Sequence, residues 1–91
     1  MPYIKPEDRA HYDSIVDALT HKLIEHGANA GDINYCFSRM LWNIFDKKGG
    51  RYAHANEIMG AVACIQAEFY RRKVAPYEDL KIGENGDVRG L

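Results

Sequence analysis

The stretch that decides the fold is HANEIMGAVACIQAEFYRR, from His54 to Arg72. At 3.6 residues per turn it carries an apolar stripe, a row of small residues and a line of ionisable groups. The stripe is Ile58, Val62, Ile65 and Phe69, and the small residues beside it are Gly60, Ala63, Cys64 and Ala67. The ionisable line is His54, Glu57, Glu68, Arg71 and Arg72. A helix with three such faces has surface left over after it packs on its own subunit.

Two further helices are expected before this one. The first is predicted for residues 6–26, since Pro6 suits a first helical position and Gly27 a helix end. The second is predicted for residues 32–48, with Asp32 as its N-cap and Gly49-Gly50 as its end. Both carry apolar residues at helical spacing, namely Tyr12, Ile15, Val16, Leu19 and Leu23 on the first and Ile33, Phe37, Met40, Leu41, Ile44 and Phe45 on the second. With the third helix, these stripes are expected to fill a common core.

The third helix is predicted for residues 53–74, and a tail follows at residues 75–91. Pro76 disfavours helical backbone at the residue before it and is expected to end the helix. Asn85-Gly86 is typical of a type I′ hairpin turn, so the tail is expected to be irregular or hairpin-like. The sequence therefore predicts an all-α fold, a small three-helix bundle in a single domain over residues 1–91, and the leftover face predicts an oligomer.

Charge and composition limit the function classes. The net charge of −1 argues against a dedicated nucleic-acid binder, which would have a basic excess. Residues 27–74 nevertheless hold seven Lys and Arg residues against four acids, which is compatible with a site for a small anion. No apolar run approaches the ~18 residues of a membrane span, and the N-terminus does not read as a signal peptide. Two isolated cysteines fit a reduced compartment, so we expect the cytoplasm of a bacterial host.

The row of small residues, Gly60, Ala63, Cys64 and Ala67, admits two interpretations. It can receive a helix of the same subunit, or it can form a subunit interface, most simply a two-fold one. We favour the interface, because the neighbouring apolar stripe already supplies a face for the local core.

The arginines near the end of the third helix predict a ligand site. Arg71 and Arg72 carry guanidinium groups, whose geometry matches carboxylate and phosphate oxygens. The predicted ligand-binding set is Arg71, Arg72, Glu68, Tyr70 and Tyr77, in which the tyrosines offer stacking surface for a base. The alternative is that these cations only complement the negative end of the helix dipole.

A metal site is the other chemistry that the third helix suggests. His54, Glu57 and Glu68 fall near one line along the helix, and such side chains can hold a metal. Helical di-metal sites, however, use Glu-x-x-His motifs from two helices, whereas this chain has a single His-x-x-Glu. The alternative is that His54 caps the helix and Glu68 pairs with an arginine. We therefore predict no metal, no cofactor and no catalytic residues.

Several motifs resemble those of a small family of uncharacterised proteins found in phages, prophages and bacteria. They are Met1–Arg9 (MPYIKPEDR), Gly31–Tyr35 (GDINY), Glu68–Arg72 (EFYRR), Ala75–Asp79 (APYED), Lys81 and Glu84–Val88 (ENGDV). Family members tend to end soon after the last motif with an aromatic residue, where this chain has Arg89–Leu91. The resemblance implies a setting rather than an activity: small accessory proteins that act on host machinery, some of which sequester nucleotide signals of bacterial defence.

The first hypothesis is a non-enzymatic helical oligomer that binds a small anionic ligand, such as a nucleotide defence signal, between subunits. One alternative is a protein–protein adaptor that inhibits a host enzyme, with acids of the tail imitating nucleic acid; these are Glu78, Asp79, Glu84 and Asp87. The other alternative is a metal-dependent enzyme that uses His54, Glu57 and Glu68.

Overall fold

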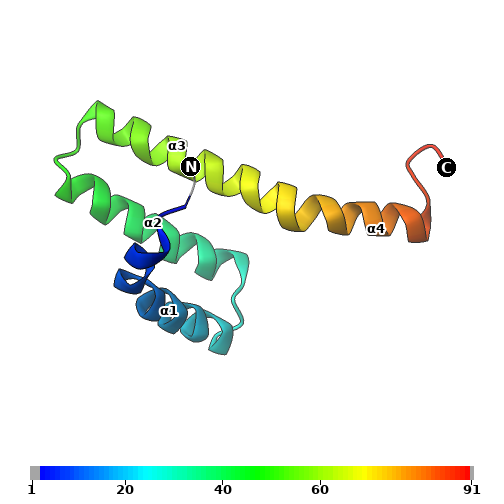
Figure 1. Cartoon of the computed structure of the whole chain (residues 1–91), viewed down its shortest axis with the longest axis horizontal. Coiled ribbons are helices and arrows are strands. Elements are labelled where there is room, and N and C mark those ends of the chain that lie inside the picture. The colour runs from blue at the N-terminus through cyan, green and yellow to red at the C-terminus, as the bar shows by residue number, and fades with distance from the viewer. Residues whose placement is uncertain (1–2, 91) are drawn as a thin grey trace. The chain divides into compact units, whose positions relative to one another are not determined.

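The computed structural model describes residues 3–90, in which every regular element is helical (Figure 1). The elements are the 3-10 helix η1 (Pro6–His11), α1 (Asp13–Glu25), α2 (Ala30–Lys47), α3 (Tyr52–Phe69), the π-helical segment η2 (Tyr70–Val74) and α4 (Ala75–Asn85). The prediction of an all-α fold is confirmed. Met1 and Pro2 of the opening motif, and Leu91 of the tail, lie outside the described residues.

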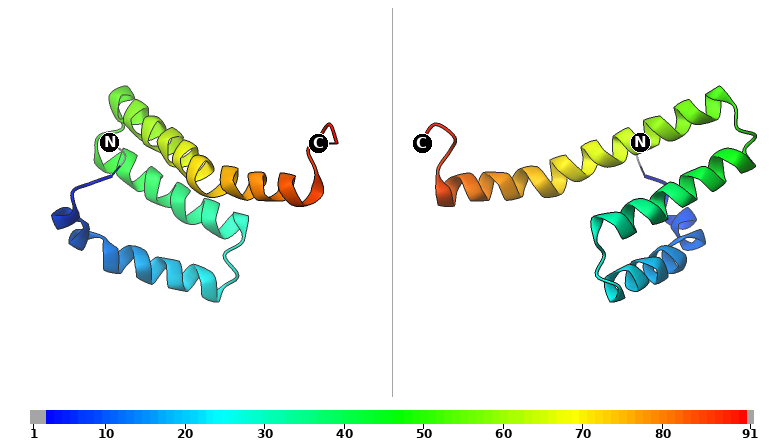
Figure 2. Two further views of the ribbon diagram at one scale, coloured as in Figure 1. Left: turned by 45° about the vertical axis from the view of Figure 1, so that its right-hand side comes forward. Right: turned by 180° about the vertical axis from the view of Figure 1, so that it is seen from behind.

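Internal contacts divide the chain into two parts, one ending at Ile58 and the other beginning at Met59. We call them the N-terminal part and the C-terminal part and describe each by itself. In the N-terminal part, α1 and α2 are antiparallel neighbours in every view (Figures 1 and 2). Their backbones rarely approach within 8 Å of each other, so they do not form a tightly packed helix pair. The prediction of a single domain over residues 1–91 stays a prediction.

The first predicted helix is interrupted. Pro6 does begin a helix, but the first turns are 3-10, and Tyr12 leaves helical backbone with φ −123°. The Tyr12 N–H donates to the carbonyl of Arg9 at 3.0 Å, an i→i+3 bond of the kind that tightens helix termini. The α-helix proper therefore starts at Asp13, seven residues later than predicted.

Glycines end α1 and α2 as predicted, and the mechanism is the same at both. Gly27 has φ +96° and its N–H donates to the carbonyl of Ile24 at 3.1 Å, while the next N–H donates to Leu23 at 2.8 Å. At the end of α2, Gly49 has φ +109° and the N–H of Gly50 donates to the carbonyl of Phe45 at 2.9 Å. Both are Schellman motifs, in which a residue with positive φ satisfies the last carbonyls.

The N-cap of α2 was predicted wrongly. Asn29, not Asp32, caps the helix, because its side-chain oxygen accepts the Asp32 N–H at 2.8 Å and Ala30 is the first helical residue. Asparagine and aspartate are about equally good N-caps, so sequence preference did not separate them. Asp32 instead lies in the first turn, where its charge complements the positive end of the helix dipole.

The start of α3 folds back beside the end of α2 (Figures 1 and 2). Lys48 Nζ lies 2.6 Å from Glu57 Oε1, and this ion pair bridges the turn. Leu41, Phe45 and Ile58 are half-buried in this hairpin. The turn between the helices is therefore bridged by a charge pair and has half-buried apolar side chains beside it.

The predicted end of the third helix at Pro76 is wrong. The helix continues through a π-helical segment, η2, into α4, so the tail is helical to Asn85 and is not a hairpin. Proline in a helix removes one N–H donor and clashes with the carbonyl four residues earlier. Here the N–H of Ala75 donates to the carbonyl of Tyr70 in the i→i+5 pattern, which widens the turn immediately before Pro76. The wider turn accommodates the ring without breaking the helix.

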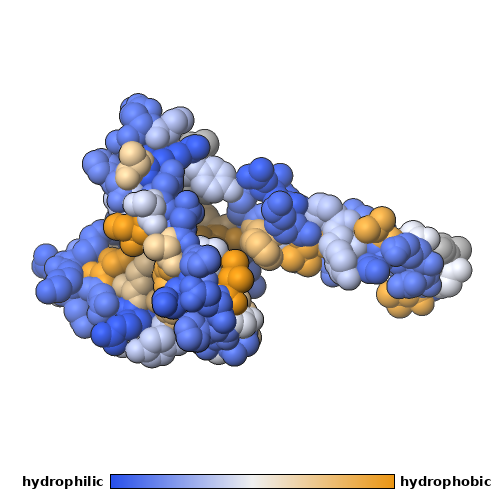
Figure 3. All heavy atoms as spheres, turned by 90° about the horizontal axis from the view of Figure 1, so that it is seen from below, coloured by the Kyte–Doolittle hydropathy of each residue, from blue (hydrophilic) through white to orange (hydrophobic). Residues whose placement is uncertain are grey.

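The three apolar stripes, which were expected to fill a common core, stay largely exposed. Among residues 3–90 no side chain is buried, and the stripes are half-buried at most. Members of all three stripes are exposed, among them Ile15, Val16, Leu19, Phe37, Met40, Ile44, Ile65 and Phe69. Figure 3 shows such apolar residues reaching the surface between hydrophilic ones. In the part of the chain that the structure describes, no helix has the length and hydropathy needed to span a bilayer.

The N-cap is open to a direct test. Asn29→Ala removes the acceptor of the Asp32 N–H and should cost about 1 kcal/mol, which lowers the melting temperature by ~4–8 °C. Thermal unfolding followed by circular dichroism, at one fixed protein concentration, measures the change. Asn43→Ala, inside the same helix and away from its cap, is the matched control and should not lower the melting temperature, because alanine is the better helix former. Equal effects of the two variants would contradict the assigned cap.

Candidate functional site

Glu68, Arg71 and Arg72, which we call the arginine cluster, lie where α3 passes into η2. Arg71 Nη2 is 2.7 Å and Arg72 Nη1 is 3.7 Å from the same carboxylate oxygen of Glu68. One acid therefore draws two guanidinium groups together, as the i,i+3 and i,i+4 spacing allows. The pairing of Glu68 with the arginines was one of the two interpretations of the sequence, and it is confirmed.

The arginine cluster keeps an excess of positive charge. Glu68 is shielded, with 24% of its side chain exposed, whereas Arg71 is 71% and Arg72 57% exposed. A guanidinium has five N–H donors in a planar fork, and Arg71 gives one nitrogen to Glu68. The adjacent Lys73 adds a further cation to the same π-helical segment. The arrangement can therefore present donors and net positive charge to an anion while Glu68 restrains the arginine side chains.

The two tyrosines of the predicted ligand site each contact a charged residue of α4. Tyr70 Oη donates to Glu78 Oε1 at 2.5 Å. Lys81 Nζ lies 5.6 Å from the centroid of the Tyr77 ring, within cation–π range. Because the ring of Tyr70 is half exposed and that of Tyr77 is exposed, both keep open aromatic surface beside these contacts.

The contact of Tyr70 with Glu78 affects its ionisation. The hydrogen bond to Glu78, together with the negative charges of Glu78 and Asp79, raises the pKa of Tyr70 above its ordinary value. The phenol is therefore protonated at neutral pH and acts as a hydrogen-bond donor, not as an activated nucleophile.

Gly60, Ala63, Cys64 and Ala67, the predicted interface, are all exposed. A Cβ atom placed on Gly60 would meet no atom of the described residues within 4 Å. The prediction that the row of small residues forms a subunit interface stays a prediction.

The three residues considered for a metal site have other partners. His54 Nδ1 accepts the N–H of Arg51 at 3.3 Å, so His54 caps the start of α3 as the alternative interpretation expected. Glu57 pairs with Lys48, and this hydrogen bond and charge lower the pKa of Glu57. Among residues 3–90 no three His, Cys, Asp or Glu side chains lie in a group suited to a metal ion.

The acids of the predicted tail belong to α4 and the turn after it rather than to a free tail. Glu78 accepts from Tyr70, Glu84 lies 3.5 Å from Lys81 Nζ, and Asp87 accepts its neighbour's N–H at 2.6 Å. A helix carrying paired acids is a weaker imitation of nucleic acid than a free acidic strand. This reduces the support for the adaptor that the tail suggested.

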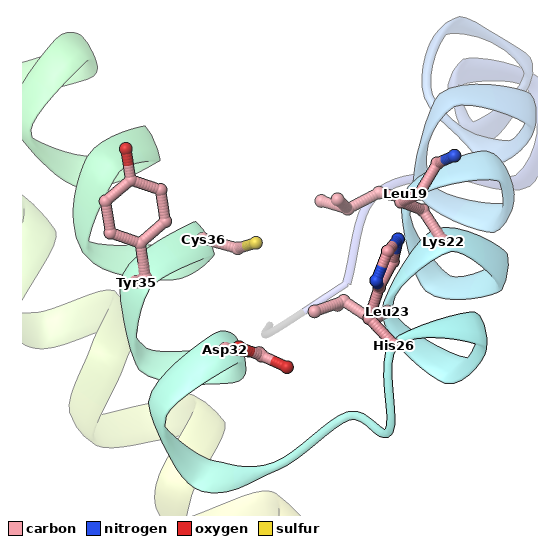
Figure 4. Close-up of a pocket in the computed structure, with 7 residues that line it drawn as sticks. All are labelled: Leu19, Lys22, Leu23, His26, Asp32, Tyr35 and Cys36. Atoms are coloured by element: carbon pink, nitrogen blue, oxygen red, sulfur yellow. The ribbon is translucent and has the colours of Figure 1, made fainter.

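A second site was missed by the sequence analysis. An open groove of about 390 Å³ lies between α1 and α2, and its wall is mainly apolar (Figure 4). The residues that line it are Leu19, Lys22, Leu23 and His26 of α1 and Asp32, Tyr35 and Cys36 of α2. Leu19 and Leu23 point across the space toward Cys36. The sequence showed the two leucines as core positions, but not that the helices stand far enough apart to leave a groove.

The contacts of α4 were missed for a different reason. Tyr77 and Lys81 are i,i+4 neighbours and would have been recognised on any predicted helix. The hydrogen bond between Tyr70 and Glu78 joins residues two turns apart on either side of Pro76. It could not be predicted from a helix that was expected to end at residue 74.

Comparison with known proteins identifies a family and no function. A family model described as "Domain of unknown function (DUF6899)" matches residues 1–88, which includes both parts of the chain. No curated protein and no solved structure matches the chain.

The ionisation of Tyr70 gives a test of the site. Since the protonated phenol donates to Glu78, this contact stabilises the protein below pH ~10 and is lost as the pH rises through the raised pKa. Ultraviolet titration of tyrosinate, taken as the difference between the wild type and Tyr70→Phe, isolates this group among the six tyrosines. The substitution Glu78→Gln should bring the pKa of Tyr70 back toward its ordinary value. Glu84→Gln, which makes the same charge change elsewhere on α4, is the control and should leave the pKa of Tyr70 raised. A pKa of Tyr70 that stays raised in Glu78→Gln would contradict the contact.

Proposed function

Because the chain belongs to the DUF6899 family, a domain of unknown function, its role must be inferred from its own residues, and we propose that it is a non-catalytic, self-assembling binding protein. In this proposal copies of the chain associate through their exposed apolar helix faces. The arginine cluster and the neighbouring Tyr70 and Tyr77 bind a small anionic ligand between subunits.

The single observation that carries the proposal is the exposure of the apolar helix faces within each part of the chain. In the N-terminal part the exposed residues include Ile15, Val16, Leu19, Phe37, Met40 and Ile44, and in the C-terminal part they include Ile65 and Phe69. Since the exposed residues include most of the apolar stripes, the surface is of the kind that obligate assemblies cover.

Binding rather than catalysis is supported by what the charged groups do. Glu57 and Glu68 are engaged by cations, and the Tyr70 phenol is held protonated, so these groups are occupied as structural contacts. The guanidinium pair fits an anion with two or more acceptor oxygens. These features suit recognition of a phosphate or carboxylate more than proton transfer.

A nucleotide is the ligand class that we propose. A phosphate would lie against the arginine cluster, and the rings of Tyr70 and Tyr77 offer stacking surface for a base. The resemblance to phage and prophage proteins supports a finer version, in which the assembly sequesters a nucleotide signal of bacterial defence in the host cytoplasm. This version rests on analogy of setting.

An adaptor that inhibits a host enzyme is the second candidate. The exposed apolar helix faces favour it, because a foreign protein can cover the same surface as another copy of the chain. The two candidates differ in solution, since an adaptor alone is monomeric until its partner is present.

The proposal is tested by light scattering and by calorimetric titration with cyclic and linear nucleotides. We expect a stable oligomer and measurable heat with at least one nucleotide. Arg71→Ala should weaken that binding roughly 10- to 100-fold, the effect of losing one or two charge-assisted hydrogen bonds. Lys47→Ala, which removes a cation from the last turn of α2, is the control and should leave binding unchanged. A strictly monomeric chain that binds none of the nucleotides would overturn the proposal.

A further inference from the structure

We propose that the groove between α1 and α2 is a two-fold interface with a second copy of this chain, in which α1 of each subunit lies over α2 of the other. The inference rests on the proposed self-assembly and names one of the surfaces that carry it. It places the contact in the N-terminal part, on residues that belong neither to the arginine cluster nor to the row of small residues.

The wall of the groove is apolar at its centre and polar at its rim. Leu19 is 43% exposed although it faces the groove, and Leu23 and Cys36 are only half-buried there. Lys22, His26, Asp32 and Tyr35 surround these apolar groups (Figure 4). An apolar centre with a polar rim is the composition of a protein–protein interface.

A protein surface fits the groove better than a small ligand does. The space is open rather than enclosed, so a small molecule would keep much of its surface in water, whereas pockets bury most of their ligand. Side chains of a second copy, by contrast, would fill the groove from above and cover both helix faces at once.

The rim is self-complementary, as a two-fold interface requires. Lys22 near the end of α1 and Asp32 near the start of α2 both line the groove, close to where the two antiparallel helices are joined. A two-fold axis along the helices places α1 of one subunit over α2 of the other and leaves each residue at its own height along the axis. Lys22 of each subunit then faces Asp32 of the partner subunit, and the axis makes this ion pair twice.

The pairing of Lys22 with Asp32 of the partner subunit can be tested by mixing two charge-reversed variants. A contact within one chain would not give the result that this pairing predicts. Lys22→Asp leaves two acids at each rim and Asp32→Lys leaves two cations, so each variant alone faces like charge across the axis. In an equimolar mixture, each subunit of the first variant meets opposite charges on the second, and both pairs are attractive again. A contact within one chain would be restored only when both substitutions are made in the same chain.

The experiment is sedimentation equilibrium on the full-length chain. We expect each single variant to raise the dissociation constant about tenfold or more, and the mixture to return it to near the wild-type value. The double variant Lys22→Asp with Asp32→Lys should also associate like the wild type. Circular dichroism, at concentrations high enough for every sample to associate, checks that the variants keep the wild-type helix content in the assembled state.

A second pair of variants tests the apolar centre without relying on charge pairing. Leu23→Asp, inside the groove, should abolish association at this surface, whereas Ile24→Asp, on the neighbouring position that does not line the groove, should have less than a threefold effect. Ile24 is 66% exposed, so the control carries the same added charge on the same helix.

The outcomes separate this inference from the proposed function. A wild-type chain that is monomeric at all concentrations overturns both. An oligomeric wild type whose association is unaffected by Lys22→Asp, Asp32→Lys and Leu23→Asp overturns only the groove interface. An equimolar mixture that stays as weak as the single variants, while the double variant recovers, assigns the pair to one chain and also overturns the inference.

Discussion

The property on which the rest of this structure depends is apolar surface that its own chain does not cover. Each helix has a regular apolar stripe, yet none of the described residues is buried. The hydrophobic effect contributes about 25 cal/mol for each Å² of apolar surface removed from water, so surface left exposed forfeits most of the free energy that holds a small domain together. What remains within one chain is mostly local: Schellman motifs, an asparagine cap and ion pairs between near neighbours. Such contacts stabilise helices by a fraction of a kcal/mol to about 1 kcal/mol each, so folding of this chain is expected to be coupled to association.

The π-helical segment is the second determinant, since it decides what Tyr70, beside the arginine cluster, can contact. By inserting a wider turn before Pro76, it allows α4 to follow α3 without an interruption. Glu78 is thereby brought onto a helix that runs on from Tyr70, and Tyr70 acquires a charged partner. Had the chain turned away at residue 75, Tyr70 would have lost this contact, whereas the contact of Tyr77 with Lys81 lies within α4 and would have remained. The proline therefore shapes the candidate site through the backbone, without a polar group of its own.

The sequence predicted those features that depend on near neighbours. Helical periodicity identified the helices, glycines identified two of their ends, and i,i+3 spacing identified the pairing of Glu68 with Arg71. It failed where two local signals compete, as at Asn29 and Asp32, which are equally good caps. It also failed where a local rule is overridden, as at Pro76, because a π-helical turn leaves no signature that distinguishes it from a helix end. The groove was beyond sequence reasoning altogether, since the separation of two helices depends on what packs between them.

The coupling of folding to association bears on how such a protein would bind its ligand. If single chains are marginally stable, the population able to bind is set by the concentration of the chain itself, and assembly and ligand binding reinforce each other. A ligand that contacts the arginine cluster of an assembled form adds to the stability of that form by RT ln(1 + [L]/Kd), which is about 2.7 kcal/mol at a hundredfold excess over Kd. An increase of this size is comparable with the whole contribution of the local contacts identified within one chain. Recognition of the ligand would thus be a property of the assembly, and a surface distant in sequence, such as the groove between α1 and α2, would influence binding by controlling how much assembly exists.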